Sequence, residues 1–145
     1  MKASNILIEK IKVFEGFSAK PCKADKSEKY LTIGYGHYGK DVKLNMTITK
    51  EAAEALLRKD LQVAENYITK LNVVKKQQEF DALVDFCYNL GCASLGNSTL
   101  LKKIKAHASE KEIRAEFNRW VHCGGKVLPG LVKRRQWEAD RFFAK

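Results

Sequence analysis

Three polar residues near the start of the chain have types and surroundings suited to acid catalysis. Glu15 ends an apolar segment, Asp25 lies in a polar one, and Thr32 opens the glycine-interrupted segment TIGYGH, residues 32–37. A general acid must stay protonated near neutral pH, and a partly desolvated carboxyl group does so. A second, ionised group then orients water or stabilises an oxocarbenium-like transition state. These groups suit the acid-catalysed attack of water on a sugar acetal.

This pattern, together with motifs further along the chain, resembles the phage-type lysozymes, also called endolysins or muramidases. In that family a Glu precedes an Asp, sometimes a Cys, and then a Thr that opens a T-I-G-x-G-H segment. The resemblance carries on in the family's order through residues 49–53, 86–91, 97–101, 120, 124–131 and 134–135. It therefore covers nearly the whole chain.

One departure from the family pattern affects the second catalytic group. The family places the Asp nine residues after the Glu, whereas that position here is Ala24. Thr32 lies 17 residues after Glu15 instead of the expected 15, so the loop of residues 21–30 is two residues longer. We expect Asp25 to fill the acidic position, because loops absorb added residues more easily than strands do. Cys22 and Glu28 are the alternatives.

The resemblance implies roles for further residues. Glu15 is the expected general acid, and its place at a helix C-terminus favours its protonated form. Thr32 is expected to face the cleft and help hold the attacking water. One of Arg134 and Arg135 is expected to reach the catalytic Glu and orient it. For His37 we expect a structural hydrogen bond or ion pair that anchors the sheet, not catalysis.

Tyr38, Tyr88 and Asn89 are candidate substrate-binding residues, because sugar rings stack on aromatic faces and hydrogen-bond to amides. A place in the core is an equally good interpretation of each. Trp120 and Trp137 are expected in the core. The four cysteines, Cys22, Cys87, Cys92 and Cys123, show no metal-ligand spacing, so we expect neither a metal nor a cofactor. Cys87 is expected to be buried, and Cys22 to be exposed.

The sequence pattern predicts one α+β domain, residues 1–145, with a lysozyme-like architecture of two lobes. A helix capped by Ser4 carries Glu15 on its last turn, and Gly16 ends it. A small antiparallel sheet follows in a lobe of about residues 16–48. The N-terminal helix and residues 49–145 form a mainly helical lobe, with Glu15 at the hinge. Its helices are expected to begin at Thr49, before Phe80, at Ser98, at the Ser109–Glu112 capping box and at Pro129.

The net charge of +10 suits an acidic partner, and the resemblance implies that this partner is the bacterial wall. The implied reaction is hydrolysis of the β-1,4 bond between N-acetylmuramic acid and N-acetylglucosamine in peptidoglycan; family analogy favours inversion. One alternative is a lytic transglycosylase, which needs one acid/base Glu and leaves 1,6-anhydro ends. Another is a non-catalytic, basic wall-binding module. Nucleic acid is not an expected partner, because no groove-reading helix motif is present.

The expected location follows from the hydropathy of the chain. No apolar run is long enough for a transmembrane helix, and the N-terminus does not match a secretory signal. We therefore expect a monomer without stable membrane insertion, held in the host cytoplasm until a partner such as a holin releases it to the wall. Delivery as a toxin or as a virion component is the alternative.

Overall fold

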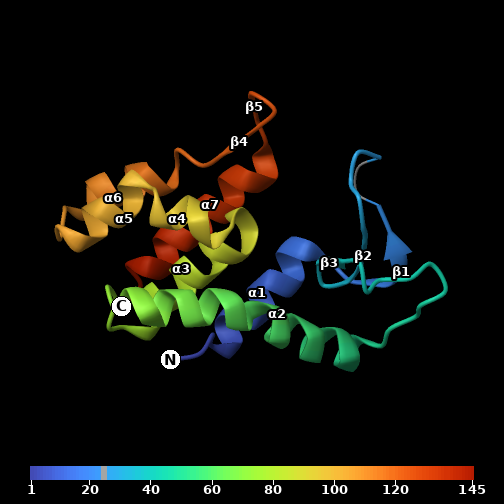
Figure 1. Cartoon of the computed structure of the whole chain (residues 1–145). Coiled ribbons are helices and arrows are strands. Elements are labelled where there is room, and N and C mark those ends of the chain that lie inside the picture. The colour runs from blue at the N-terminus through green and yellow to red at the C-terminus, as the bar shows by residue number, and fades with distance from the viewer. Residues whose placement is uncertain (24–25) are drawn as a thin grey trace. The chain divides into compact units, whose positions relative to one another are not determined.

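A computed structural model describes residues 1–23 and 26–145 of the chain (Figure 1). Helices and a small antiparallel sheet together form an α+β fold, which confirms the predicted fold class. The chain divides into two compact units. We call residues Ile8–Gln62 the sheet unit, and Met1–Leu7 with Val63–Lys145 the helical unit.

Helix α1, Asn5–Glu15, begins and ends where local chemistry predicts. The Ser4 hydroxyl accepts a hydrogen bond from the Leu7 backbone N–H at 3.3 Å, as an N-cap does. Gly16 follows the helix in a left-handed conformation, with φ of +70°. Glycine adopts that conformation without a Cβ clash, so the helix stops directly after Glu15.

The sheet unit contains three antiparallel strands in the order β1-β2-β3: Ser18–Cys22, Leu31–Gly34 and His37–Gly39. Between β2 and β3 the register is regular, and Thr32 lies opposite Tyr38. Between β1 and β2 it shifts: Ser18 lies opposite Gly34, and Cys22 lies opposite Thr32. The outer strand β1 therefore holds more residues between these paired positions than the central strand does, which is a β-bulge.

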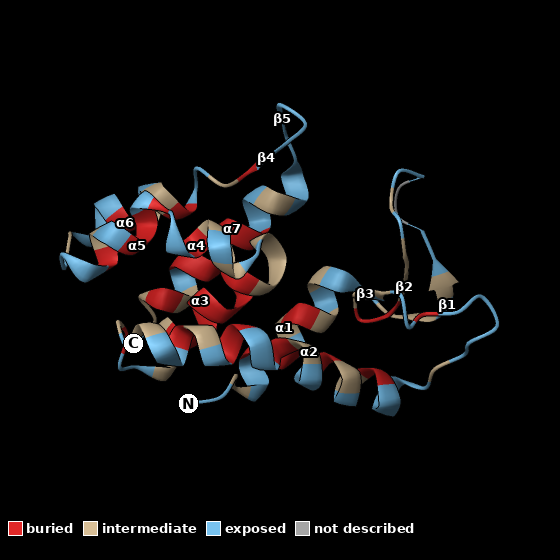
Figure 2. Cartoon of the chain, in the orientation of Figure 1, coloured by how far each residue is buried: buried red, intermediate tan, exposed pale blue. Residues whose placement is uncertain are grey.

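Helix α2, Lys50–Leu71, is the long amphipathic helix that the apolar spacing predicts. Its N-cap is Thr49, whose hydroxyl accepts a hydrogen bond from the Ala52 N–H at 3.1 Å. Buried residues recur along one side of the helix, and exposed residues follow the other (Figure 2).

The helical unit contains most of the remaining elements. They are α3 (Gln77–Leu90), α4 (Cys92–Gly96), α5 (Thr99–Lys105), α6 (Glu110–Phe117), β4 (His122–Cys123), β5 (Lys126–Val127) and α7 (Pro129–Phe142). The predicted caps Ser98 and Ser109 each accept a backbone hydrogen bond at the start of α5 and α6. Sequence patterns did not predict α4 or the β4–β5 hairpin, which are short.

Helices α3 and α7 pack against each other in the core of the helical unit. Aromatic rings fill much of this core. Phe86 makes edge-to-face contacts with Phe117 and with Trp120, at centroid distances of 6.1 and 5.4 Å. Trp120 thus contacts the core, as predicted, although it lies beyond the end of α6.

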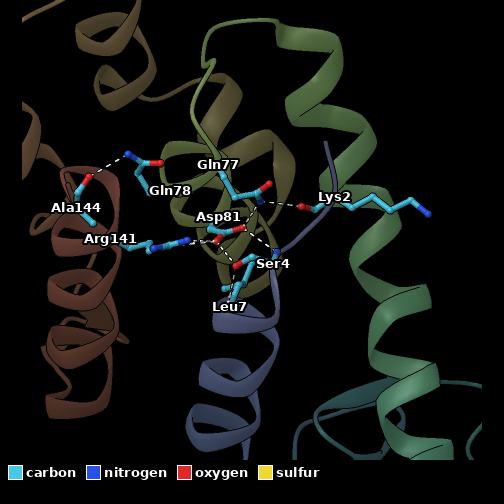
Figure 3. A network of polar contacts seen from close by, with 8 residues as sticks. All are labelled: Lys2, Ser4, Leu7, Gln77, Gln78, Asp81, Arg141 and Ala144. Carbon is cyan, nitrogen blue, oxygen red and sulfur yellow. Dashed lines mark hydrogen bonds and ion pairs between the residues drawn. The ribbon is translucent and has the colours of Figure 1, made fainter.

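Asp81, fully buried on α3, joins three parts of the helical unit (Figure 3). Its carboxylate accepts hydrogen bonds from the Ser4 N–H and hydroxyl at 3.0 and 2.5 Å. The same carboxylate binds Arg141 of α7 at 2.8 Å and the Gln77 amide at 2.8 Å. Asp81 therefore fixes the residue that caps α1.

Candidate functional site

The carboxyl group of Glu15 is positioned by the end of α1. Glu15 is the last residue of the helix, and the next N–H, that of Gly16, donates to the Lys12 carbonyl at 2.9 Å. Lys12 is itself held by ion pairs with Glu9 and Glu54. Lys12 therefore ties the last turn of α1, which carries Glu15, to α2. Glu15 itself is exposed.

The side chain of Glu15 lies against the backbone of Gly36, in the turn between β2 and β3. A Cβ atom at position 36 would lie 2.8 Å from Glu15 Oε1, 3.0 Å from Cδ and 3.2 Å from Cγ. Gly36 also has a φ of +87°, which residues with a Cβ rarely adopt. The turn and the carboxyl group thus fit together because residue 36 has no side chain.

Thr32 lies half-buried on the central strand β2, between Cys22 of β1 and Tyr38 of β3. Its placement on a strand matches the sequence prediction. Asp25 lies outside the described residues, so its role as the second acidic group stays a prediction. Of the two alternatives, Cys22 is exposed at the end of β1, and Glu28 is half-buried.

His37 makes two ion pairs within the sheet unit. Its Nδ1 lies 2.7 Å from Asp60 Oδ2 on α2, and its Nε2 lies 2.9 Å from Asp41 Oδ2. Burial lowers the pKa of His37, but the hydrogen bonds to Asp60 and Asp41 outweigh it and raise the pKa above its ordinary value. With both ring nitrogens engaged, His37 links β3 to α2 through Asp60, and its supporting role at the site stays a prediction.

Tyr38 presents an exposed ring on β3, with 44% of its surface accessible. The Tyr30 N–H donates to its hydroxyl at 3.1 Å, and the two rings meet edge to face at 5.5 Å. The ring is therefore held by Tyr30 and yet remains exposed. An exposed aromatic ring can stack against a sugar, but substrate contact by Tyr38 stays a prediction.

Arg134 and Arg135 lie on α7, and both are buried in the helical unit. Arg134 binds both oxygens of Asp85, through Nη2 at 2.8 Å and Nε at 3.0 Å. Arg135 donates through Nη2 to Asn89 Oδ1 at 2.6 Å and to Glu138 at 2.9 Å. Orientation of Glu15 by one of these arginines stays a prediction.

Tyr88 and Asn89, both half-buried, lie near the end of α3. Because Asn89 Oδ1 accepts the Arg135 hydrogen bond, the Asn89 side chain is held by the interior of the helical unit. Their roles in substrate binding also stay predictions.

A pair of buried carboxyl groups accompanies the two arginines, and sequence reasoning missed it. Burial raises the pKa of Glu138 well above its ordinary value, and the hydrogen bond to Asp85 adds to this. Burial opposes ionisation of Asp85 too, but the hydrogen bond from Glu138 and the charge of Arg134 lower its pKa overall. Arg135, which pairs with Glu138 at 2.8 Å, opposes the rise in the Glu138 pKa but does not cancel it. Asp81 and Asp85, four residues apart among apolar residues of α3, were the available signal.

Within residues 1–23 and 26–145, no group of three or more His, Cys, Asp or Glu side chains is placed to hold a metal ion. The same residues include no helix with the length and apolar character needed to cross a bilayer. All four cysteines are free thiols; Cys87 is buried and Cys22 exposed, as predicted.

Comparison with known proteins places most of the chain in one family. The family model described as phage lysozyme matches residues 12–138. An endolysin of Bacillus phage B103 is 48% identical over 143 residues, 98% of this chain and 54% of that protein. An endolysin of Acyrthosiphon pisum secondary endosymbiont phage 1 is 37% identical over 139 residues, 91% of each protein. The chain spans about half the length of the Bacillus phage relatives.

Solved structures give the same result for the fold. The muramidase domain of SpmX from Asticaccaulis excentricus aligns with a TM-score of 0.88 and 31% identity, over 99% of each chain. An endolysin from Escherichia coli O157:H7 phage FAHEc1 aligns with a TM-score of 0.85 and 32% identity, over 99% of this chain and 94% of that one. The predicted lysozyme-like architecture is therefore confirmed.

Proposed function

Because the chain belongs to the phage lysozyme family, we propose that it hydrolyses the β-1,4 bond between N-acetylmuramic acid and N-acetylglucosamine in bacterial peptidoglycan. The observation that carries this proposal is the family match over residues 12–138, which includes Glu15 at its helix end. Support comes also from the turn at Gly36, whose bare backbone leaves room for the Glu15 carboxyl group.

In the proposed reaction, Glu15 donates its proton to the glycosidic oxygen as the bond to the anomeric carbon breaks. Water attacks that carbon and passes a proton to the solvent, which leaves a reducing muramic acid end. Asp25 and Thr32 are proposed to orient the water or to stabilise the positive charge that develops. No cofactor is needed for this chemistry.

Other residues are proposed to support this reaction. Tyr38, Tyr88 and Asn89 would contact the sugar chain, and one of Arg134 and Arg135 would orient Glu15. An arginine beside Glu15 would favour its ionised form, so desolvation by the bound substrate would have to restore the proton. His37 would hold the sheet that carries Thr32.

The route to the substrate is part of the same proposal. A net charge of +10 would speed encounter with the acidic wall in a salt-dependent manner. We propose that the protein acts as a monomer and reaches the wall from the host cytoplasm once a partner such as a holin opens the membrane. The names of its phage relatives, endolysins, support release of this kind.

Digestion of purified peptidoglycan, followed by mass spectrometry of the products, tests the function. Wild type, Glu15→Gln and a control, Glu51→Gln, would be compared, since Glu51 is an exposed acid in the first turn of α2. We expect reducing muramic acid ends from wild type and the control, and a loss of about 10²–10⁴-fold in rate for Glu15→Gln.

Other products would overturn the proposal in distinct ways. 1,6-Anhydro ends, one water lighter, would identify a lytic transglycosylase. Wall binding with no products from any variant would identify a non-catalytic binding module. Full activity of a folded Glu15→Gln variant would remove Glu15 from the role of acid.

A further inference from the structure

A pocket of about 390 Å³ lies in the helical unit, among residues that neither the family motifs nor the proposed reaction uses. It is formed by the segment before α3, the end of α5, the start of α6 and the end of α7. Its apolar lining includes Val74, Ile104, Ile113 and Phe142, each less than a tenth exposed. These side chains belong to the hydrophobic core, so part of the pocket wall is apolar.

Two lysines contribute positive charge to the lining of this pocket. Lys75 and Lys76 line it and are exposed, and His107 lines it as well. Lys76 directly precedes α3, so the two lysines stand at the positive end of the helix dipole. One acid, Glu79, also lines the pocket, and its carboxylate accepts the backbone N–H groups of Lys75 and Lys76 at 3.4 and 3.3 Å.

A pocket lined by apolar side chains and by two lysines suits a ligand with two matching parts. Polar sugars would lose hydrogen bonds to water against Val74, Ile104 and Phe142 without replacing them. An alkyl chain would gain by leaving water at the same place. The volume lies at the lower end of the range for small-molecule sites, so it suits one chain and not the two chains of a bilayer lipid.

We propose that this pocket binds a single-chain amphiphilic carboxylate, with its alkyl chain against Ile104, Ile113 and Phe142 and its carboxylate between Lys75 and Lys76. None of the residues that line this pocket is among those proposed for peptidoglycan hydrolysis. The pocket therefore provides a second binding activity, which stands whether or not the chain is a hydrolase.

Titration with decanoate, below its micelle concentration, tests the proposal through the methyl NMR signals of Val74, Ile104 and Ile113. We expect saturable shifts of these signals. Decyltrimethylammonium has the same chain and the opposite charge, and it should bind at least about tenfold more weakly; acetate, which has no chain, should not bind. Equal binding of the cation, or decanoate shifts confined to other methyl groups, would overturn the proposal.

Variants separate the head-group contact from general effects of charge. The pair Lys75→Glu and Lys76→Glu should weaken decanoate binding about tenfold or more, because two attractions become repulsions. The matched control, Lys40→Glu with Lys43→Glu, makes the same change of charge on exposed lysines of the sheet unit and should bind as wild type does. Equal weakening in both variants would show that net charge alone attracts the anion.

A third variant and a vesicle assay complete the test. Ala108→Trp should fill the pocket and abolish the shifts, with melting as the check on folding. Peptidoglycan hydrolysis should be unchanged in Ala108→Trp, and the two charge variants should hydrolyse at the same rate as each other, because both lower the net charge equally. Binding to phosphatidylglycerol vesicles without any binding of decanoate would refute a single-chain site in favour of a membrane surface.

Discussion

The carboxyl group of Glu15 rests on the backbone of Gly36, at a position where any Cβ atom would come within 2.8 Å of Oε1. Two separate constraints meet at this glycine. Its φ of +87° is strained for residues with a side chain, and the space that a side chain would need is occupied by Glu15. The turn between β2 and β3 therefore helps to set where the proposed acid lies.

Gly36→Ala should lower hydrolysis by about 10–100-fold, because the added methyl group must displace the Glu15 carboxyl group. It should also cost about 1–2 kcal/mol of unfolding free energy through backbone strain. Gly125→Ala is the matched control: Gly125 has a φ of +80°, but a Cβ there meets nothing within 4 Å. The control should lose similar stability and keep its rate. Equal rates for the two variants would contradict the positional role of Gly36.

The second acidic group can be identified by substitution in the long loop. Asp25→Asn should reduce hydrolysis by about 10²-fold or more if Asp25 orients the water. Glu28→Gln and Cys22→Ser test the two alternatives and should each stay within about twofold of wild type. If Asp25→Asn is fully active and one of the others is not, the acidic position belongs to that residue. Rates measured at one pH on the same peptidoglycan decide the question.

Asp81→Asn should lower the free energy of unfolding by about 3 kcal/mol or more. The change removes the charge that Arg141 faces and weakens the hydrogen bonds that hold Ser4, all in a fully buried place. Asp140→Asn provides the control, since the side chain of Asp140 is 59% exposed and pairs with Arg114 at the surface. That variant should lose less than about 1 kcal/mol in the same urea denaturation. A similar loss of unfolding free energy in both variants would show that the buried contacts of Asp81 stabilise the fold no more than a surface ion pair does.

The ion pairs of His37 should make stability depend on pH. Its folded pKa is raised, so the stabilisation is fully present below the unfolded pKa of about 6.5 and is lost as pH rises through the folded value. His37→Gln should therefore be less stable than wild type by about 0.5–1 kcal/mol near pH 6, and the difference should shrink in alkali. His37 lowers the pKa of Asp41. The stabilisation that Asp41 contributes is therefore lost as pH falls through the folded-state pKa of Asp41.

Denaturation of wild type and His37→Gln between about pH 5 and 9 measures this difference. If the difference in unfolding free energy between the two proteins instead grew as pH rises, His37 would stabilise the fold in its neutral form, contrary to this prediction.

The sequence predicted the features that neighbouring residues determine. The caps Ser4, Thr49, Ser98 and Ser109 bond to N–H groups three residues away, so their signal is contained in a short window. The family resemblance rested on such local motifs and is confirmed by the match over residues 12–138. The place of Gly36 between strand residues also predicted a bend or a close approach at this glycine.

Features that depend on residues far apart in the sequence could not be predicted from local patterns. Asp85 looks like a polar interruption of an apolar helix until Arg134 and Glu138 are brought beside it by packing of α3 on α7. The roles of Asp41 and Asp60 depend likewise on where the sheet places His37. The segment of α4 is too short for an apolar period to be recognised.

The bulge in β1 has a consequence for how this fold can vary. Ser18 and Cys22 of the outer strand face Gly34 and Thr32 of the central strand, so β1 already accommodates surplus residues without moving its partner. Thr32 is held independently from the other side, by its regular pairing with Tyr38. A change in the number of residues in β1 therefore need not change the pairing of the central strand with β3. The outer strand β1 is accordingly the place in this sheet at which added residues would disturb the central strand least.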